Sequence, residues 1–229
     1  MAIKYESVVP WGRTFEEYVD MFNLTESDLD KYILGCGDGP ASFNCTMKQR
    51  GNKIISIDPI YQFTKDDILK RIKETYQIVI NQTYQNEDKF IWTKIKDVED
   101  LGRIRMLAMN SFIADFDTGK KENRYIFAEL PNLPFEDNQF DLSLSSHFLF
   151  LYTDNLSLEF HIQSINEMLR VSREVRIFPL LDVNAKRSLY VDEVIGKYIQ
   201  IGYYVKEVKV DYEFQKGGNT MLKIARTNK

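Results

Sequence analysis

The sequence predicts an α/β protein with a doubly wound, mostly parallel sheet, an antiparallel pair of strands at the C-terminal end and a helical insertion after the second strand. Short apolar runs alternate with longer amphipathic segments through most of the chain, a pattern typical of βαβ units whose sheet is covered on both faces. Three glycines follow the first apolar run, and a Gly-Gly turn separates the last two runs. Glycines at such places let the backbone turn sharply.

The first strand, helix and strand are expected between residues 32 and 57. Residues 32–34 form an apolar run that ends in ILGCGDGP, and residues 53–57 form a second run that ends at Asp58. The segment ASFNCTMKQRG between them is long enough for a helix. Pro40 suits the first helical position, because its missing N–H would have no acceptor there. We therefore expect this helix to begin at residue 40.

The remaining elements are predicted by the same alternation. FEEYVDMF forms a helix near the N-terminus, and YYVKEVKVDYEF and TMLKIART form the antiparallel pair on either side of QKGGN. The other expected elements are strands at 125–128, 141–145 and 175–181 and helices at about 156–171 and 190–201.

More than sixty residues separate Asp58 from the strand at 125, whereas a whole βαβ unit needs only about 30. Apolar residues recur at helical spacing after Thr64 and after Asp97, and both residues suit an N-cap. We expect a single domain, residues 1–229, with a helical insertion at about 64–122. The insertion leaves the ligand-binding edge of the sheet, so it is expected to act as a lid.

Composition limits the possible functions. Lys and Arg total 30 against 34 Asp and Glu, a net charge of -4, which disfavours nucleic acid as a partner. The apolar run FLFLY is too short to span a membrane, so a cytoplasmic protein is expected. Cys36 and Cys45 fit neither a disulfide framework nor a CxxC metal pair. We expect two reduced thiols and no metal site.

The glycine turn is a candidate ligand site. Gly35, Gly37 and Gly39 lie between a strand and a helix, where small residues let the backbone approach a ligand. Such a turn alone is as often purely structural. Asp58, however, ends the next strand, where a carboxylate can accept hydrogen bonds from both hydroxyls of a ribose. Together these features indicate a nucleoside.

Two residues argue against a dinucleotide. Pro40 stands in the region where the G-x-G-x-x-G fingerprint requires a further glycine. The Asp38 carboxylate would be unfavourable beside a pyrophosphate but compatible with a cationic sulfonium. A cationic nucleoside therefore fits this turn better than NAD.

These motifs resemble those of the class I, Rossmann-like S-adenosylmethionine-dependent methyltransferases, especially the branch with an LPF…FD motif. ILGCGDGP is similar to the glycine-rich first motif, SIDPIY to the second, and LPFEDNQFDLSLSSHFLFLY to the third and fourth. The whole chain also resembles a set of bacterial methyltransferase-like proteins that share WGRTFEEY, GPASFN and YEFQKGGN. The resemblance implies a seven-stranded sheet and S-adenosylmethionine as cofactor.

The resemblance also implies site residues. Asp58 would hold the ribose, Pro59 and Ile60 the adenine ring, and Glu129 the adenine amino group. The full set of expected cofactor contacts is Gly35, Cys36, Gly37, Asp38, Gly39, Asp58, Pro59, Ile60, Glu129, Leu130 and Ser146. The aromatic residues expected on the substrate side are Trp11, Tyr18 and Tyr152.

Methyl transfer is an in-line displacement that needs alignment and exclusion of water more than a particular catalytic group. His147 follows Ser146 at the carboxyl end of a strand and has an ordinary pKa suited to a base, so it is the candidate catalytic residue. A purely structural histidine is an equally open interpretation, and for His161, in a helix, it is the preferred one.

A small-molecule acceptor is expected, because the chain contains neither an NPPY-like amide methylation motif nor a basic cluster with interleaved aromatics for RNA. The alternative is a non-catalytic S-adenosylmethionine-binding module, which the fold and the cofactor motif do not distinguish from an enzyme. The sequence does not indicate an oligomeric state.

Overall fold

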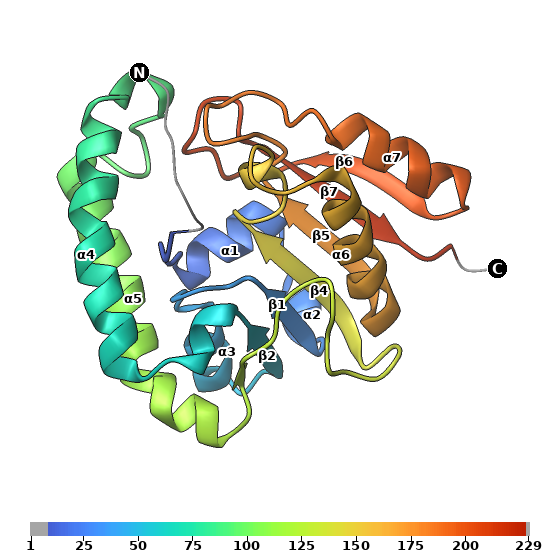
Figure 1. Ribbon diagram of the computed structural model, residues 1–229, viewed down its shortest axis with the longest axis horizontal. Helices are drawn as coiled ribbons and strands as arrows, with labels where there is room; N and C mark the ends of the chain where they lie inside the picture. Colours follow the sequence, from blue (N-terminus) through green and yellow to red (C-terminus); the bar gives the residue numbers. More distant parts are fainter. Residues whose placement is uncertain (1–8, 228–229) are drawn as a thin grey trace.

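A computed structural model describes residues 9–227 and contains one mixed sheet of seven strands in the order β3-β2-β1-β4-β5-β7-β6 (Figure 1). Strand β7 pairs antiparallel with both β5 and β6, while the other pairings are parallel. The predicted fold class is confirmed. The strands are β1 Ile33–Cys36, β2 Ile54–Ile57, β3 Tyr125–Ile126, β4 Phe140–Ser146, β5 Ser172–Phe178, β6 Tyr204–Lys209 and β7 Thr220–Ala225.

Helices cover both faces of the sheet. On one face, α6 and α7 pack against β4, β5 and β6; on the other, α1 and α3 contact β2, β5 and β7. Ile33 and Leu34, adjacent in β1, belong to different hydrophobic clusters because successive strand residues point to opposite faces. The α-helices are α1 Phe15–Phe22, α2 Glu26–Leu29, α3 Phe43–Gln49, α4 Lys65–Tyr84, α5 Val98–Lys121, α6 Leu158–Val171 and α7 Val191–Gln200.

The expectation that a helix begins at Pro40 is wrong, because α3 begins at Phe43. Residues 40–42 remain part of the turn because they contact the segment before α1. The Ser42 N–H donates to the Arg13 carbonyl at 3.0 Å, and a Cβ on Gly12 would lie 2.1 Å from the Pro40 oxygen. This close packing holds Pro40 in the loop and places residues 9–13 beside the glycine turn.

The predicted insertion forms a pair of helices, α4 and α5, that lie side by side at one end of the sheet (Figure 1). Both predicted N-caps are confirmed: the side chain of Thr64 accepts from the Asp67 N–H, and that of Asp97 from the Asp100 N–H. Helix α5 also contacts α3 and β3. It is therefore part of the layered core as well as of the insertion.

The connection between α4 and α5 reaches the loop between β6 and β7. The Ile91 N–H donates to the Phe214 carbonyl at 2.7 Å, and the rings of Phe90 and Phe214 stack with centroids 4.8 Å apart. The insertion is thus anchored at its tip. No helix within residues 9–227 is both long enough and apolar enough to cross a membrane.

Candidate functional site

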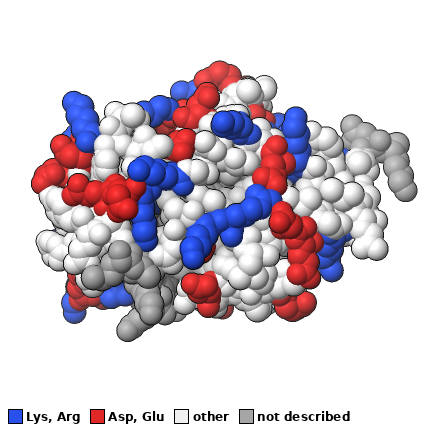
Figure 2. All heavy atoms as spheres, turned by 90° about the horizontal axis from the view of Figure 1, so that it is seen from above, with Lys and Arg blue, Asp and Glu red and all other residues white. Residues whose placement is uncertain are grey.

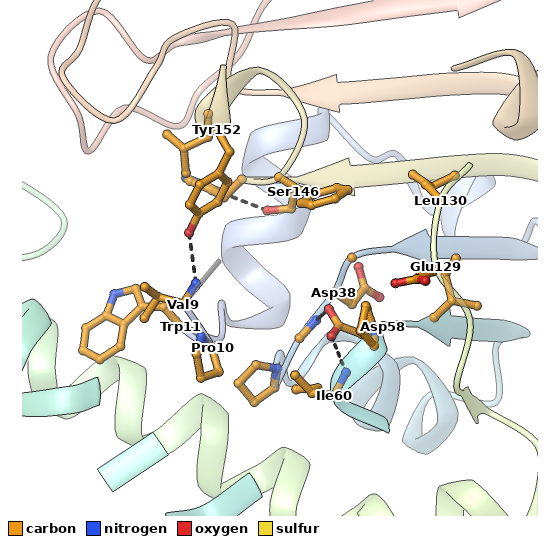
Figure 3. Close-up of a pocket in the computed structure, with 18 of the residues that line it drawn as sticks. Val9, Pro10, Trp11, Asp38, Asp58, Ile60, Glu129, Leu130, Ser146 and Tyr152 are labelled. Atoms are coloured by element: carbon orange, nitrogen blue, oxygen red, sulfur yellow. Dashed lines mark hydrogen bonds between the residues drawn. The ribbon is translucent and has the colours of Figure 1, made fainter. Parts of the chain in front are cut away.

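A cavity of about 490 Å³ lies at the carboxyl ends of β1, β2 and β4, beside residues 9–13 (Figure 3). Parallel strands place their carboxyl ends at one edge of a sheet, so residues that are far apart in the sequence meet here. The predicted site residues that line the cavity are Trp11, Tyr18, Gly37, Asp38, Gly39, Asp58, Pro59, Ile60, Glu129, Leu130, Ser146, His147 and Tyr152.

Gly35 and Cys36 are predicted cofactor contacts that do not line the cavity. Both lie within β1, and the Cys36 side chain belongs to the hydrophobic core on the α6 side of the sheet. Burial raises the pKa of the Cys36 thiol well above its usual value. The structure therefore places both residues beneath the site.

Asp58 links the end of β2 to the glycine turn. Its Oδ2 accepts the Gly39 N–H at 2.8 Å, and its Oδ1 accepts the Ile60 N–H at 2.9 Å. Burial raises the pKa of Asp58 to about 6, although these two hydrogen bonds favour the ionised form. Each carboxylate oxygen can accept a further hydrogen bond, so Asp58 can still receive hydroxyl groups from the cavity.

Asp38 connects α1 to β2 under the turn. Its Oδ1 accepts the Tyr18 hydroxyl at 2.9 Å, and its Oδ2 accepts the Ser56 hydroxyl at 2.6 Å. Burial, reinforced by the charge of Asp58, raises the pKa of Asp38 to about 7. Tyr18, predicted on the substrate side, thus directs its hydroxyl to the carboxylate below the glycine turn.

The two sides of the cavity are lined by different residues. On the side of the glycine turn, Ile60 and Leu130 provide apolar surface, and the Glu129 side chain is exposed. Figure 3 shows Glu129 and Leu130 beside Asp38 and Asp58, whereas Trp11 and Tyr152 lie at the other side of the cavity. The Tyr152 hydroxyl accepts the Val9 N–H at 3.2 Å (Figure 3), which ties residues 9–13 to the loop after β4.

His147 lies at the carboxyl end of β4 with a left-handed backbone, φ +52. Its N–H donates to the Phe178 carbonyl at 2.7 Å, and its Nδ1 is 2.9 Å from the Ser146 hydroxyl. Burial and the charges of Arg13 and Arg105 lower its pKa well below the usual value. The expectation that His147 has the basicity of an ordinary histidine is therefore wrong.

His161 has the structural role expected of it. It is fully buried in α6, where its Nδ1 lies 2.7 Å from the Ser157 carbonyl oxygen, and its ring stacks on Phe150.

Two arginines that act on His147 are not among the site residues predicted from the sequence. Arg13 lines the cavity, and Arg105, on α5, has no exposed surface. Arg105 lies in the helical stripe of Leu101, Ala108 and Phe112. A charged residue within an apolar stripe is the signal that could have indicated a buried charge.

Comparisons with known proteins give one relative by sequence. No protein-family model matches the chain. The uncharacterized protein MJ0045 of Methanocaldococcus jannaschii is 35% identical over 227 residues, which cover 98% of this chain and 99% of the relative. This relative is archaeal; the bacterial subgroup and the LPF…FD branch stay predictions.

Several solved structures are similar at much lower sequence identity. Magnesium protoporphyrin IX methyltransferase from Synechocystis PCC 6803, with bound SAM, is 9% identical with a TM-score of 0.46, covering 88% of this chain and 73% of its own. A SAM-dependent methyltransferase from Aquifex aeolicus is 12% identical with a TM-score of 0.43, covering 91% and 90%. The identity and coverage of the sequence match, rather than these likenesses, establish the relationship: the chain belongs to the same protein family as MJ0045 of Methanocaldococcus jannaschii.

Proposed function

We propose that this protein is an S-adenosylmethionine-dependent methyltransferase that acts on a small molecule. The observation that carries the proposal is the cavity at the strand ends, in which the glycine turn is tied to Asp58. Open α/β sheets bind ligands at this edge. The sequence motifs that resemble methyltransferases fall on the same turn.

The residues of the cavity fit this cofactor. Gly37 and Gly39 have φ values of +70 and +54, and a Cβ on Gly37 would lie 3.2 Å from the Phe148 ring, so the turn favours glycine at both positions. Ile60 and Leu130 offer apolar surface for a flat base, and Asp58 can accept ribose hydroxyls. The carboxyl groups of Asp38 and Asp58, when ionised, favour a cation at this end.

When bound, S-adenosylmethionine supplies a methyl group activated by a positive sulfur. The chain must position an acceptor in line with it and keep water out. Residues 9–13 form one wall, which Tyr152 holds through Val9. His147 is the proposed hydrogen-bond acceptor or base for the methyl acceptor, since it lines the same cavity and its lowered pKa favours the neutral ring.

A small acceptor is supported by the limited volume of the cavity, about 490 Å³, part of which the cofactor would occupy. On the face drawn in Figure 2, basic and acidic side chains are interspersed. Such a surface does not favour a polyanionic backbone.

One observation favours a second candidate, a non-catalytic S-adenosylmethionine-binding module. The low basicity of His147 weakens it as a proton acceptor. The test is calorimetric titration with S-adenosylmethionine, combined with mass spectrometry of ligand that copurifies. Binding together with copurified S-adenosylhomocysteine would support the enzyme, and binding of the unreacted cofactor alone would support the module. No binding would contradict both.

A further inference from the structure

Two guanidinium groups, those of Arg13 and Arg105, act on His147, which lines the cavity. Arg13 comes from the segment before α1 and lines the cavity, while Arg105 comes from α5 and is fully buried. The two groups are close enough that the charge of Arg105 lowers the pKa of Arg13, in addition to the larger effect of burial. Like charges held together in a buried place are unfavourable unless they are compensated.

Glu17 is the carboxylate that faces this pair. Its Oε2 accepts from Arg105 Nη1 and from the Thr14 N–H, and its Oε1 accepts the Tyr212 hydroxyl at 2.9 Å. Within residues 9–227, Arg13 forms no ion pair, and its Nη1 donates to the Trp11 carbonyl. One carboxylate thus serves two guanidinium groups, which leaves an excess positive charge.

Several donors of the pair are unused. In the described part of the chain, Arg13 Nε and Arg105 Nε and Nη2 are buried and have no hydrogen-bond partner. A buried donor without a partner is unfavourable, and more so when it is charged. An anion bound in the cavity would supply an acceptor for Arg13, which lines it, and the missing negative charge.

The positive charge lies at the end of the cavity away from the proposed nucleoside site. Both arginines act on the pKa of His147 and on that of Tyr212. Arg13 Nη1 donates to the carbonyl of Trp11, which Figure 3 shows across the cavity from Asp38 and Asp58. The cavity is therefore acidic at the glycine turn and basic at His147.

We propose that the methyl acceptor carries a carboxylate, or a similar small anionic group, that Arg13 binds with Arg105 supporting its charge from behind. This inference rests on the proposed function, because it assumes a cofactor at the glycine turn. The bound anion would also offset the positive charges beside His147. The acceptor would thereby make this imidazole more basic.

The experiment measures binding of paired probes to the protein saturated with S-adenosylhomocysteine. The probes are benzoate, phenylacetate and cinnamate, each compared with its uncharged amide, because the wall also contains aromatic Trp11, Phe148 and Tyr152. At least one carboxylate should bind tenfold or more tightly than its amide. Arg13→Gln should reduce that preference to less than twofold, and Arg13→Lys, which keeps the charge, should retain most of it.

Arg103→Gln is the matched control, since Arg103 is exposed on α5 and pairs with Asp100 at 2.6 Å. It should keep the full preference. Absence of a carboxylate preference in the wild type, or its persistence in Arg13→Gln, would overturn the inference.

S-adenosylhomocysteine itself carries a carboxylate, so its own affinity is measured in parallel. Arg13→Gln should bind it as the wild type does. A tenfold loss of affinity, with unchanged affinity for 5′-methylthioadenosine, would assign Arg13 to the carboxylate of the cofactor and overturn the assignment to the acceptor. A wild-type protein that does not bind S-adenosylhomocysteine would instead contradict the proposed function on which the inference rests.

Discussion

Gly35 and Asp38 use the same space: a Cβ atom on Gly35 would lie 1.8 Å from Oδ2 of Asp38. No side chain at residue 35 is compatible with the observed position of this carboxylate, which accepts hydrogen bonds from Tyr18 and Ser56. The first glycine of the motif is therefore required by the protein itself, and the acidic residue three positions later folds back beneath it.

Gly35→Ala should destabilise the protein by about 1–3 kcal/mol, because the added methyl group displaces the Asp38 carboxylate. The free energy of unfolding in urea measures this change. Gly196→Ala is the control: Gly196 is exposed within α7, and a Cβ there would meet nothing within 4 Å. That substitution should stabilise the protein by about 0.5–1 kcal/mol. Equal effects of the two substitutions would show that the clash is relieved without cost.

The pH dependence of stability, compared between the wild type and Asp38→Asn, tests the buried carboxyl group of Asp38. The folded pKa of Asp38, about 7, lies above the ordinary value of 3.8, so between these values the folded state binds more protons than the unfolded state. This contribution to stability is complete below about pH 4 and is lost as the pH rises through 7. Wild-type stability should fall relative to Asp38→Asn by up to about 1.4 kcal/mol per pH unit in that window. Parallel pH profiles would contradict the assignment.

Asp58→Ala should weaken S-adenosylmethionine binding by about 1.5–3 kcal/mol through the loss of two charge-assisted hydrogen bonds. It should also lower stability, because the Gly39 and Ile60 N–H groups lose their acceptor. Asp67→Ala separates the two effects. Asp67 belongs to the exposed capping box of α4, so its loss should cost about 1 kcal/mol of stability and leave affinity unchanged. Equal affinities of Asp58→Ala and wild type would remove Asp58 from the site.

The layers of the fold were predictable because they depend on local patterns. The strands at residues 54–57 and 140–146 and the caps at Thr64 and Asp97 lie within a residue or two of their expected positions. The start of α3 was not predictable, because it depends on packing between Pro40 and the distant Gly12.

The features of the site that the sequence did not predict also depend on contacts between distant residues. Motifs located most of the cavity lining, because residues at the ends of parallel strands converge on one edge. The direction of the Asp38 side chain depends on donors from α1 and β2, which no local pattern contains. The lowered pKa of His147 likewise depends on burial and on the charges of Arg13 and Arg105, which lie 134 and 42 positions before it in the chain.

The insertion is proposed to act as a lid whose tip is held by Phe214. The rings of Phe90 and Trp92 lie 4.8 and 5.3 Å from that of Phe214, and Phe214→Ala would remove both contacts. Limited proteolysis should then cut faster within residues 85–97, and S-adenosylmethionine should slow cleavage of the wild type there. Phe63→Ala, at a side chain that is 50% exposed, should cleave as the wild type does. Cleavage that ligand does not change would contradict a lid.

His147 has a left-handed backbone and a pKa lowered well below its usual value, so its catalytic role and its structural role need separate tests. In NMR titrations its imidazole should stay neutral at pH values where an ordinary histidine is half protonated, and Arg13→Gln should raise its pKa, because a nearby positive charge is removed. An ordinary titration in the wild type would contradict the effect of burial and of the two arginines.

His147→Asn preserves the backbone more closely than other replacements, since asparagine tolerates φ near +52. If the ring receives a proton from the acceptor, turnover per folded molecule should fall at least tenfold while affinity for S-adenosylmethionine stays nearly unchanged. The assay uses hydroxylated carboxylic acids first, because these combine a methylatable oxygen with the anion that Arg13 is proposed to bind. A lower melting temperature with full turnover would make His147 a structural residue, whose packing against Phe178 fixes the end of β4. In that case the reaction would depend only on the alignment of the methyl acceptor with the cofactor.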